Sequence, residues 1–224
     1  MDVKDFQQLV KNGDLAAVKA ALRDQPALLD ATNEAGQSGF ILAMYYRQRE
    51  VADYLLSLGP QLDVFNACIA GETERVLHDV RSNPDLLDAQ SSDGWTPLHL
   101  AAFFGHADLA EALIDQGAKV DAKSSNAMRN TPLHAAAAGG QIGVMELLLK
   151  RGANANATQE GGDWTALHSA AQAGNRQMVE VLVANGAHVN ARAANGQSAL
   201  DLALSKGHHE VAELLEHLGA KLQS

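Results

Sequence analysis

Apolar residues recur along this chain at the spacing of amphipathic helices, and polar stretches separate them. Leu109, Leu113 and Ile114, for example, fall on one face of a helix. Such stretches come in consecutive pairs, with a glycine between the two members of most pairs and another glycine after the pair. Glycine adopts a left-handed backbone at little cost, so these positions predict tight turns. The pattern predicts pairs of short helices joined by turns and loops.

A seven-residue motif marks the first helix of four successive pairs. It reads Thr-Pro-Leu-His-Leu-Ala-Ala from Thr96, and related copies begin at Thr131, Thr165 and Ser198. The four starts lie 35, 34 and 33 residues apart. A fixed period of this length is the signature of an array in which each unit stacks on its neighbours.

Each part of the motif has a physical role at a helix start. The threonine hydroxyl can cap the helix, and the proline after it suits the first turn, where a missing N–H costs nothing. The paired alanines allow helices of neighbouring units to approach closely. Gly105 and Gly117 illustrate the two turn positions, one between the helices of a pair and one after the pair. The motif is therefore that of a stacked helical repeat.

With this motif, spacing and order, the sequence resembles the ankyrin-repeat family over its whole length. A weaker copy begins at Ser38, and an offset of 58 residues relates it to Thr96 and relates Gly13 to Gly71. The resemblance implies an all-α ankyrin-repeat solenoid of about seven helix-turn-helix repeats with short β-hairpin-like loops, forming a single domain over residues 1–224. It also implies that the motif histidines brace the turns through hydrogen bonds to the backbone; these are His99, His134 and His168. The repeats are expected at approximately 1–33, 34–62, 63–91, 92–124, 125–158, 159–191 and 192–224, the first and last acting as caps.

The first half of the chain departs from the pattern. Arg47 occupies the glycine position of the second repeat, and the third repeat has Phe65-Asn66-Ala67-Cys68 in place of Thr-Pro-Leu-His. Pro26 and Pro84 predict that the second helices of repeats one and three end before them, because proline cannot continue a helix. In the last repeat, Asp201 replaces the motif histidine.

Composition narrows the class of partner and the compartment. The chain carries 17 basic and 27 acidic residues, a net charge of −10 that repels nucleic acid. Its single cysteine, Cys68, excludes an intrachain disulfide and fits the cytoplasm. No stretch approaches the roughly 20 apolar residues that cross a membrane, the nearest being Phe40 to Tyr46. We expect a cytoplasmic monomer that binds neither nucleic acid nor membrane.

Signatures of catalysis are missing from the sequence. It contains no Gly-x-x-x-x-Gly-Lys phosphate loop, no Gly-x-Ser-x-Gly elbow and no Cys-x-x-Cys pair, so neither an enzyme nor a cofactor is expected. His209, Glu213 and His217 lie at i, i+4 and i+8 and could ligate a divalent metal from one helix face. The favoured alternative makes them exposed residues of a capping helix. Cys68 takes the place of a buried alanine, which argues against a nucleophile.

Aromatic residues gather at the positions that line the concave face in the resembled family. Trp95 and Trp164 precede the motif, while two further pairs precede the turn between the helices. Aromatic side chains are the usual hot spots of interfaces. Longer loops at 124–130 and 159–163 extend two hairpin tips toward a partner. The expected contact residues are Tyr45, Tyr46, Trp95, Phe103, Phe104, Met128, Arg129 and Trp164.

The leading hypothesis is a non-catalytic scaffold that grips another protein or a peptide in an aromatic groove centred on repeats two to six. The acidic body favours a basic partner through electrostatic steering. Two alternatives stay open. One is a metal-dependent or enzymatic regulator that uses the His/Glu/His cluster, and the other is a purely architectural subunit whose contacts are made by the convex helices.

Overall fold

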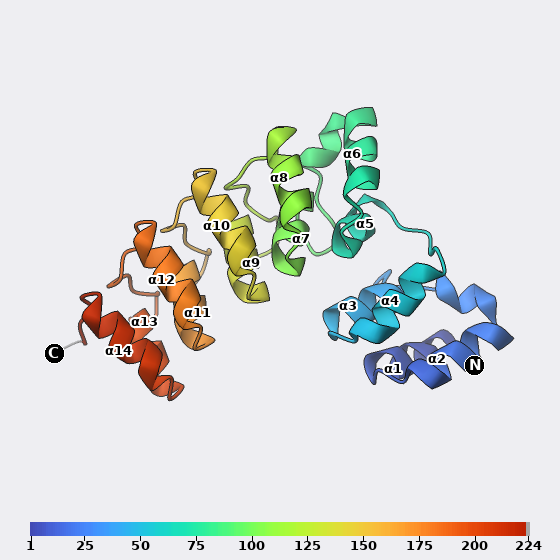
Figure 1. Ribbon diagram of the computed structural model, residues 1–224, viewed down its shortest axis with the longest axis horizontal. Helices are drawn as coiled ribbons and strands as arrows, with labels where there is room; N and C mark the ends of the chain where they lie inside the picture. The colour runs from blue at the N-terminus through green and yellow to red at the C-terminus, as the bar shows by residue number, and fades with distance from the viewer. Residues whose placement is uncertain (223–224) are drawn as a thin grey trace. The chain divides into compact units, whose positions relative to one another are not determined.

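The computed structural model describes residues 1–222 and is built from helices (Figure 1). Within these residues there are fourteen α-helices and two short 3-10 helices, and no strand longer than the isolated bridges Thr32–Ser38 and Arg192–Ser198. The chain divides into two compact units, Met1–Ala70 and Gly71–Ser224. The prediction of an all-α repeat architecture is confirmed, and a single domain over the whole chain stays a prediction.

The first unit holds two helix pairs and the first helix of a third. Helix α1 packs on α2 and α3, and α3 packs on α4 and α5. Phe6, Phe40 and Leu55 are among its fully buried side chains and fill the space between these helices. The elements are α1 (Val3–Lys11), α2 (Leu15–Asp24), η1 (Pro26–Leu29), α3 (Gly39–Tyr45), α4 (Arg49–Ser57) and α5 (Val64–Ala70).

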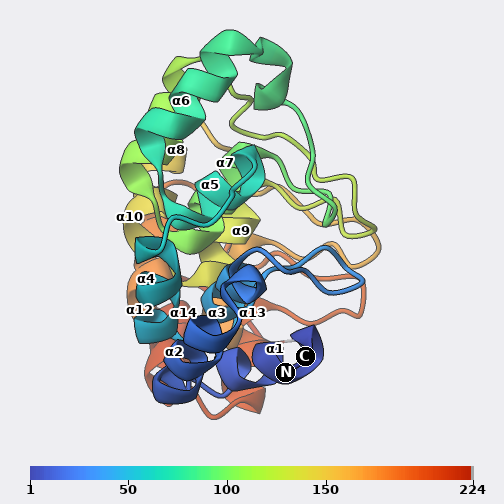
Figure 2. The same cartoon turned by 90° about the vertical axis from the view of Figure 1, so that its right-hand side faces the viewer.

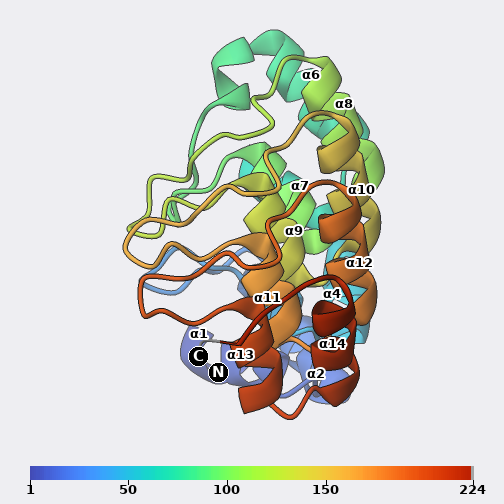
Figure 3. The same cartoon turned by 90° about the vertical axis from the view of Figure 1, so that its left-hand side faces the viewer.

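The second unit is a double row of helices. The inner row is α7, α9, α11 and α13, each packed on the next, and the outer row is α6, α8, α10, α12 and α14 (Figure 2). Loops project from the inner row on the side away from the outer row (Figure 3). The elements are α6 (Thr73–Ser82), η2 (Pro84–Leu87), α7 (Pro97–Phe104), α8 (Ala107–Asp115), α9 (Pro132–Gly139), α10 (Ile142–Lys150), α11 (Ala166–Gln172), α12 (Arg176–Ala184), α13 (Ala199–Ser205) and α14 (His209–His217).

The seven predicted repeats each contain two consecutive α-helices, and the departures from the pattern behave as expected. Helices α2 and α6 end just before Pro26 and Pro84, and a 3-10 turn follows each. Arg47 holds a left-handed backbone with φ of 57°, which confirms that it occupies a glycine position.

The predicted alignment of the third repeat with the Thr-Pro-Leu-His motif was wrong. Helix α5 begins at Val64, and the Asp63 carboxylate accepts the Asn66 N–H at 2.7 Å. Asp63 therefore takes the place of the motif threonine, two residues before Phe65. A carboxylate caps a helix as well as a hydroxyl does, so the helix start persists although the Thr-Pro signal is lost.

Candidate binding groove

A hollow of about 620 Å³ lies in the second unit, between the hairpin loops and the inner helices. This size falls within the range of about 300–1,000 Å³ that ligand sites occupy. Its floor comes from α9 and α11, and its walls come from the loops before α7, α9 and α11. We call it the tryptophan groove; its lining is Trp95, Met128, Asn130, His134, Ala135, Ala138, Gln159, Glu160, Gly161, Gly162, Trp164, Ser169 and Gln172.

Trp95 forms one wall of the tryptophan groove from the position just before α7. Its ring stands edge-on to Phe103, with centroids 5.3 Å apart, and lies tilted against His99 at 6.1 Å. These contacts fix the half-buried indole at the angle that aromatic pairs prefer. In the described residues its indole N–H has no acceptor, so the wall presents an unpaired donor.

Trp164 forms the wall two repeats further on. Its indole N–H donates to the Ser169 hydroxyl at 3.0 Å, and its ring lies 5.2 Å from that of His168. Its carbonyl also accepts the Nε2–H of His134 at 3.1 Å. Side chain and backbone of Trp164 are both held by hydrogen bonds, so this wall has a fixed geometry.

The motif histidines hold the groove residues to the helices. Nδ1 of His99 accepts from the Thr96 N–H and lies 2.8 Å from the Thr96 hydroxyl, so its proton is on Nε2. That Nε2–H donates to the Asn130 carbonyl at 2.9 Å, in the loop of the next repeat. His134 and His168 repeat the arrangement. The expected bracing role is confirmed.

These imidazoles are kept neutral by their surroundings. Burial lowers the pKa of His99 and of His134 from 6.5 to about 4, although the carbonyl that each contacts acts in the opposite direction. The pKa of His168 is lowered for the same reason. The hydrogen bond from the backbone N–H to Nδ1 requires a neutral ring, because a proton on Nδ1 would point at that N–H.

Asn130 lies between the two tryptophans, at the equivalent position of the intervening repeat. The residue is only 8% exposed, and its Oδ1 is buried with no hydrogen-bond partner in the described part of the chain. Leaving a buried carbonyl oxygen without a donor costs about 1–3 kcal/mol. The sequence expectations did not include Asn130, although the rule that selected Trp95 and Trp164, the residue just before the motif, applies to it equally.

Met128 and Arg129 lie at the tip of the longer loop before α9. Met128 is 51% exposed, while Arg129 has φ of 44° and pairs with Glu160 at 2.7 Å. The N–H of Glu160 donates to the Met128 carbonyl at 2.9 Å, which joins this tip to the next. Two further main-chain bonds of this kind link neighbouring tips, Ser125 to Gly94 and Ala194 to Gly162. The tips thus form a connected rim.

Phe103 and Phe104 do not line the tryptophan groove. Their rings meet edge-on at 5.1 Å, and the Phe103 ring also contacts that of Trp95. The Phe103 carbonyl accepts from Gln141 at 3.3 Å and lies so close to Gly139 that any side chain there would overlap with it. Phe103 thus contacts both the Trp95 wall and the neighbouring helix, and a place for Phe103 or Phe104 in partner binding stays a prediction.

Tyr45 and Tyr46 belong to the first unit. Tyr45 is half-buried, whereas Tyr46 is 52% exposed and carries the Lys11 ammonium 5.4 Å from its ring centroid. A cation over an aromatic face at this distance is a favourable contact. Their place in partner binding stays a prediction.

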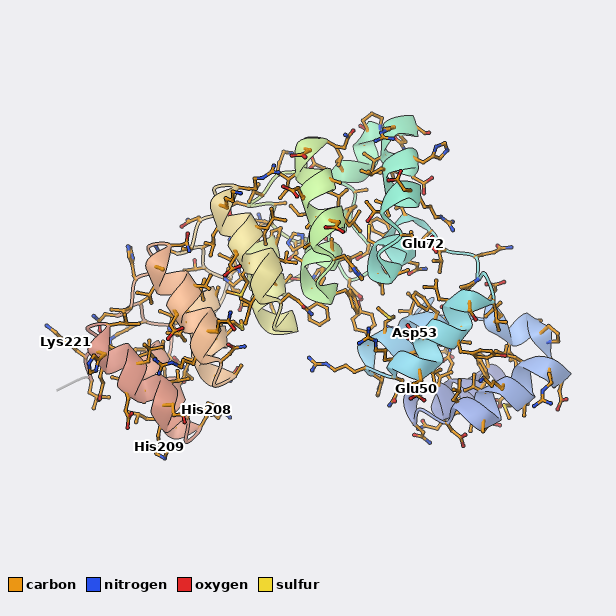
Figure 4. The ribbon with its side chains drawn as sticks, viewed as in Figure 1. Glu50, Asp53, Glu72, His208, His209 and Lys221 are labelled. Atoms are coloured by element: carbon orange, nitrogen blue, oxygen red, sulfur yellow. The ribbon has the colours of Figure 1, made fainter. Side chains whose placement is uncertain are left out.

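The structure does not support a metal site on the last helix. His209, Glu213 and His217 are exposed on α14, and Figure 4 shows His209 pointing away from the helices. No three His, Cys, Asp or Glu side chains among residues 1–222 are grouped so that they could hold a metal ion. Three ligands spread along one exposed helix face lack the converging geometry that a metal needs.

The structure also places two other features considered in the sequence. Cys68 is fully buried. No helix in the described part of the chain is long and apolar enough to cross a membrane.

Stacked helix pairs, braced loops and projecting tips define a helical-repeat interaction module. A family model described as "Ankyrin repeats (3 copies)" matches residues 64–159 and 153–224, so the chain belongs to the ankyrin-repeat family. Ankyrin repeats are protein–protein interaction modules and generally carry no enzymatic activity.

Two curated proteins are similar to parts of the chain. "Ankyrin repeat and SAM domain-containing protein 6" of Danio rerio is 30% identical over 123 residues, which is 50% of this chain and 17% of that protein. "Oxysterol-binding protein-related protein 1" of Mus musculus is 54% identical over 33 residues, 15% of this chain and 4% of that protein. The chain therefore matches only a small part of each relative.

Proposed function

We propose that this protein is a non-catalytic binding scaffold that holds another protein or a peptide in the tryptophan groove and along its connected tips. One observation carries the proposal: Trp95, Met128 and Trp164, three of the residues selected from the sequence, line one hollow. Two of them are fixed by contacts to the motif histidines or their neighbours, as hot-spot residues of an interface are expected to be.

Charge indicates the type of partner. The net charge of −10 attracts basic segments and speeds their encounter with the chain. Within the groove, however, the carboxylate of Glu160 is already paired with Arg129. Basic residues of the partner are therefore expected beside the groove, and binding should weaken as salt screens the long-range attraction.

The wider setting is part of the same proposal. The chain acts as one ankyrin-repeat domain, as a monomer, in the cytoplasm, where a lone buried cysteine stays reduced. It needs no cofactor. Of the two alternatives, the metal-dependent regulator rested on His209, Glu213 and His217. These exposed residues of α14 do not converge on one point, so this alternative is not favoured.

Photo-crosslinking tests the proposal directly. A benzoylphenylalanine placed at Met128 in the full chain should crosslink a protein partner in native cells, whereas the same probe at Glu213, exposed on the outer row, should not. Trp95→Ala and Trp164→Ala should each remove the crosslink, with circular dichroism confirming that the helices remain. Crosslinks from Glu213 alone would favour the architectural alternative and overturn the proposal.

A further inference from the structure

The residue just before each motif occupies the same place in successive loops. In three repeats it carries a side-chain amide, and the amide oxygen accepts a hydrogen bond in Gln37 and Gln197 but not in Asn130. Oε1 of Gln37 accepts from Asn33 at 3.2 Å, and Oε1 of Gln197 accepts from Asn195 at 2.7 Å. Oδ1 of Asn130 is buried and has no partner. The exception is the one that lies in the groove.

No hydrogen bond within the described residues holds the side-chain amide of the buried residue Asn130. Its main-chain carbonyl is fixed by the His99 Nε2–H and by the Ser124 N–H, but no hydrogen bond engages the side chain. Because Oδ1 is buried, the amide must turn to present this oxygen to a donor in the groove. The terminal torsion of asparagine is broad, so this turn breaks no hydrogen bond. A ligand that brings such a donor removes the cost of an unmade hydrogen bond.

The rest of the tryptophan groove specifies what else the ligand must offer. Trp95, Asn130 and Trp164 come from three successive repeats, so they form a line. Among residues 1–222, the Trp95 indole N–H has no acceptor and Asn130 Oδ1 has no donor. A peptide group supplies both an N–H and a carbonyl.

The lining also restricts the side chains of the ligand. Glu160 is paired with Arg129, and burial keeps His134 neutral. Ala135 and Ala138 leave space on the floor between the aromatic walls. Apolar side chains fit such a site, and a charged one would lose its hydration without finding an opposite charge.

We infer that the tryptophan groove binds an extended peptide segment, uncharged at its centre, whose main-chain N–H donates to Asn130 Oδ1 between the two tryptophans. This inference rests on the proposed function and adds the class of ligand and its central contact. Basic residues flank the uncharged centre.

A random library of 12-residue peptides displayed on phage, panned against the full chain, supplies the probe. Selected sequences are synthesised with a fluorescein label, and their Kd is measured by anisotropy. Asn130→Leu is the main variant because leucine has nearly the same shape and keeps the main-chain carbonyl that His99 contacts. Gln197→Leu is the matched control at the equivalent position of the last repeat.

The expected result separates binding from folding. Asn130→Leu should raise the Kd at least tenfold and leave the unfolding midpoint unchanged or higher, since it removes an unpaired buried polar group. A purely structural role predicts a lower midpoint. Methylating the peptide nitrogens one at a time should identify one N–H whose loss costs tenfold in the native chain and nothing in Asn130→Leu. Gln197→Leu should leave the Kd unchanged.

Failure of the inference can be told apart from failure of the proposed function. Peptides that need Trp95 and Trp164 but bind Asn130→Leu with unchanged Kd overturn the inference and leave the groove as the binding site. Peptides that bind without either tryptophan contradict both. A library that yields no binder also overturns the inference, while a crosslink from position 128 to a folded partner would then keep the proposed function.

Discussion

The Nε2–H of His99 donates to the carbonyl of Asn130, 2.9 Å away and 31 residues further along the chain. This bond ties the first helix of one repeat to the groove-lining loop of the next. It requires the Nε2–H form of a neutral ring, because Nδ1 accepts from Thr96. The repeat signature and the groove thus depend on the same protonation state.

Stability is therefore expected to fall in mild acid. The unfolded pKa of histidine is about 6.5, and the folded pKa values of His99 and His134 are about 4, so unfolded chains bind more protons between these values. The stabilising difference is complete above about pH 6.5 and is lost as pH falls toward 4. Each ring contributes a slope of up to about 1.4 kcal/mol per pH unit.

Urea unfolding of the native chain and of His134→Gln at pH 7.5, 6 and 5 measures this slope. Glutamine removes the titrating group, so the variant should depend less steeply on pH. His188→Gln, which changes an exposed imidazole, is the control and should follow the native chain. Equal slopes for all three proteins would contradict the buried, neutral ring.

Two glycines in neighbouring helices should respond oppositely to alanine. In α9, a β-carbon at Gly139 would overlap with the Phe103 carbonyl, so Gly139→Ala should lower the unfolding midpoint. In α10, nothing lies within 4 Å of a β-carbon at Gly143, so Gly143→Ala should gain up to about 1 kcal/mol from helix propensity. Thermal unfolding followed by circular dichroism compares them, and stabilisation by both would refute the close approach of α7 and α9.

Arg47 should be replaceable by glycine with a gain in stability. Its φ of 57° is unfavourable for a residue with a β-carbon, so Arg47→Gly should stabilise by about 0.5–1 kcal/mol. Arg49→Gly is the matched control, because the same substitution at the first position of α4 removes side-chain atoms without relieving a left-handed backbone. It should be neutral or destabilising by up to about 1 kcal/mol. The midpoints of urea unfolding of the two variants and of the native chain measure these differences. A midpoint of Arg47→Gly no higher than that of the native chain would contradict the prediction.

The cap of α5 should show the register of the third repeat. Asp63→Ala removes the carboxylate that accepts the Asn66 N–H and should cost about 1 kcal/mol. Asp53→Ala, an exposed change in α4, should have little effect. An equal response of the two in urea unfolding would contradict the assignment of Asp63 as the capping residue.

The sequence determined the repeats, the helix pairs, the turn positions and the bracing histidines, because each depends on local chemistry that recurs at a fixed period. A left-handed turn, a helix cap or an apolar stripe depends on residues that are close together in the sequence. Where the local signal weakened, as at Asp63, the register was misplaced by two residues.

Only the tertiary structure decided which exposed-looking residues share a surface. Phe103 and Trp95 both lay at positions expected to line a groove, yet one supports the other, since the side chain that reaches the hollow depends on what packs behind it. The unpaired oxygen of Asn130 has no sequence signal at all. Whether a buried polar atom finds a partner depends on distances between residues remote in the chain, and only folding sets those distances.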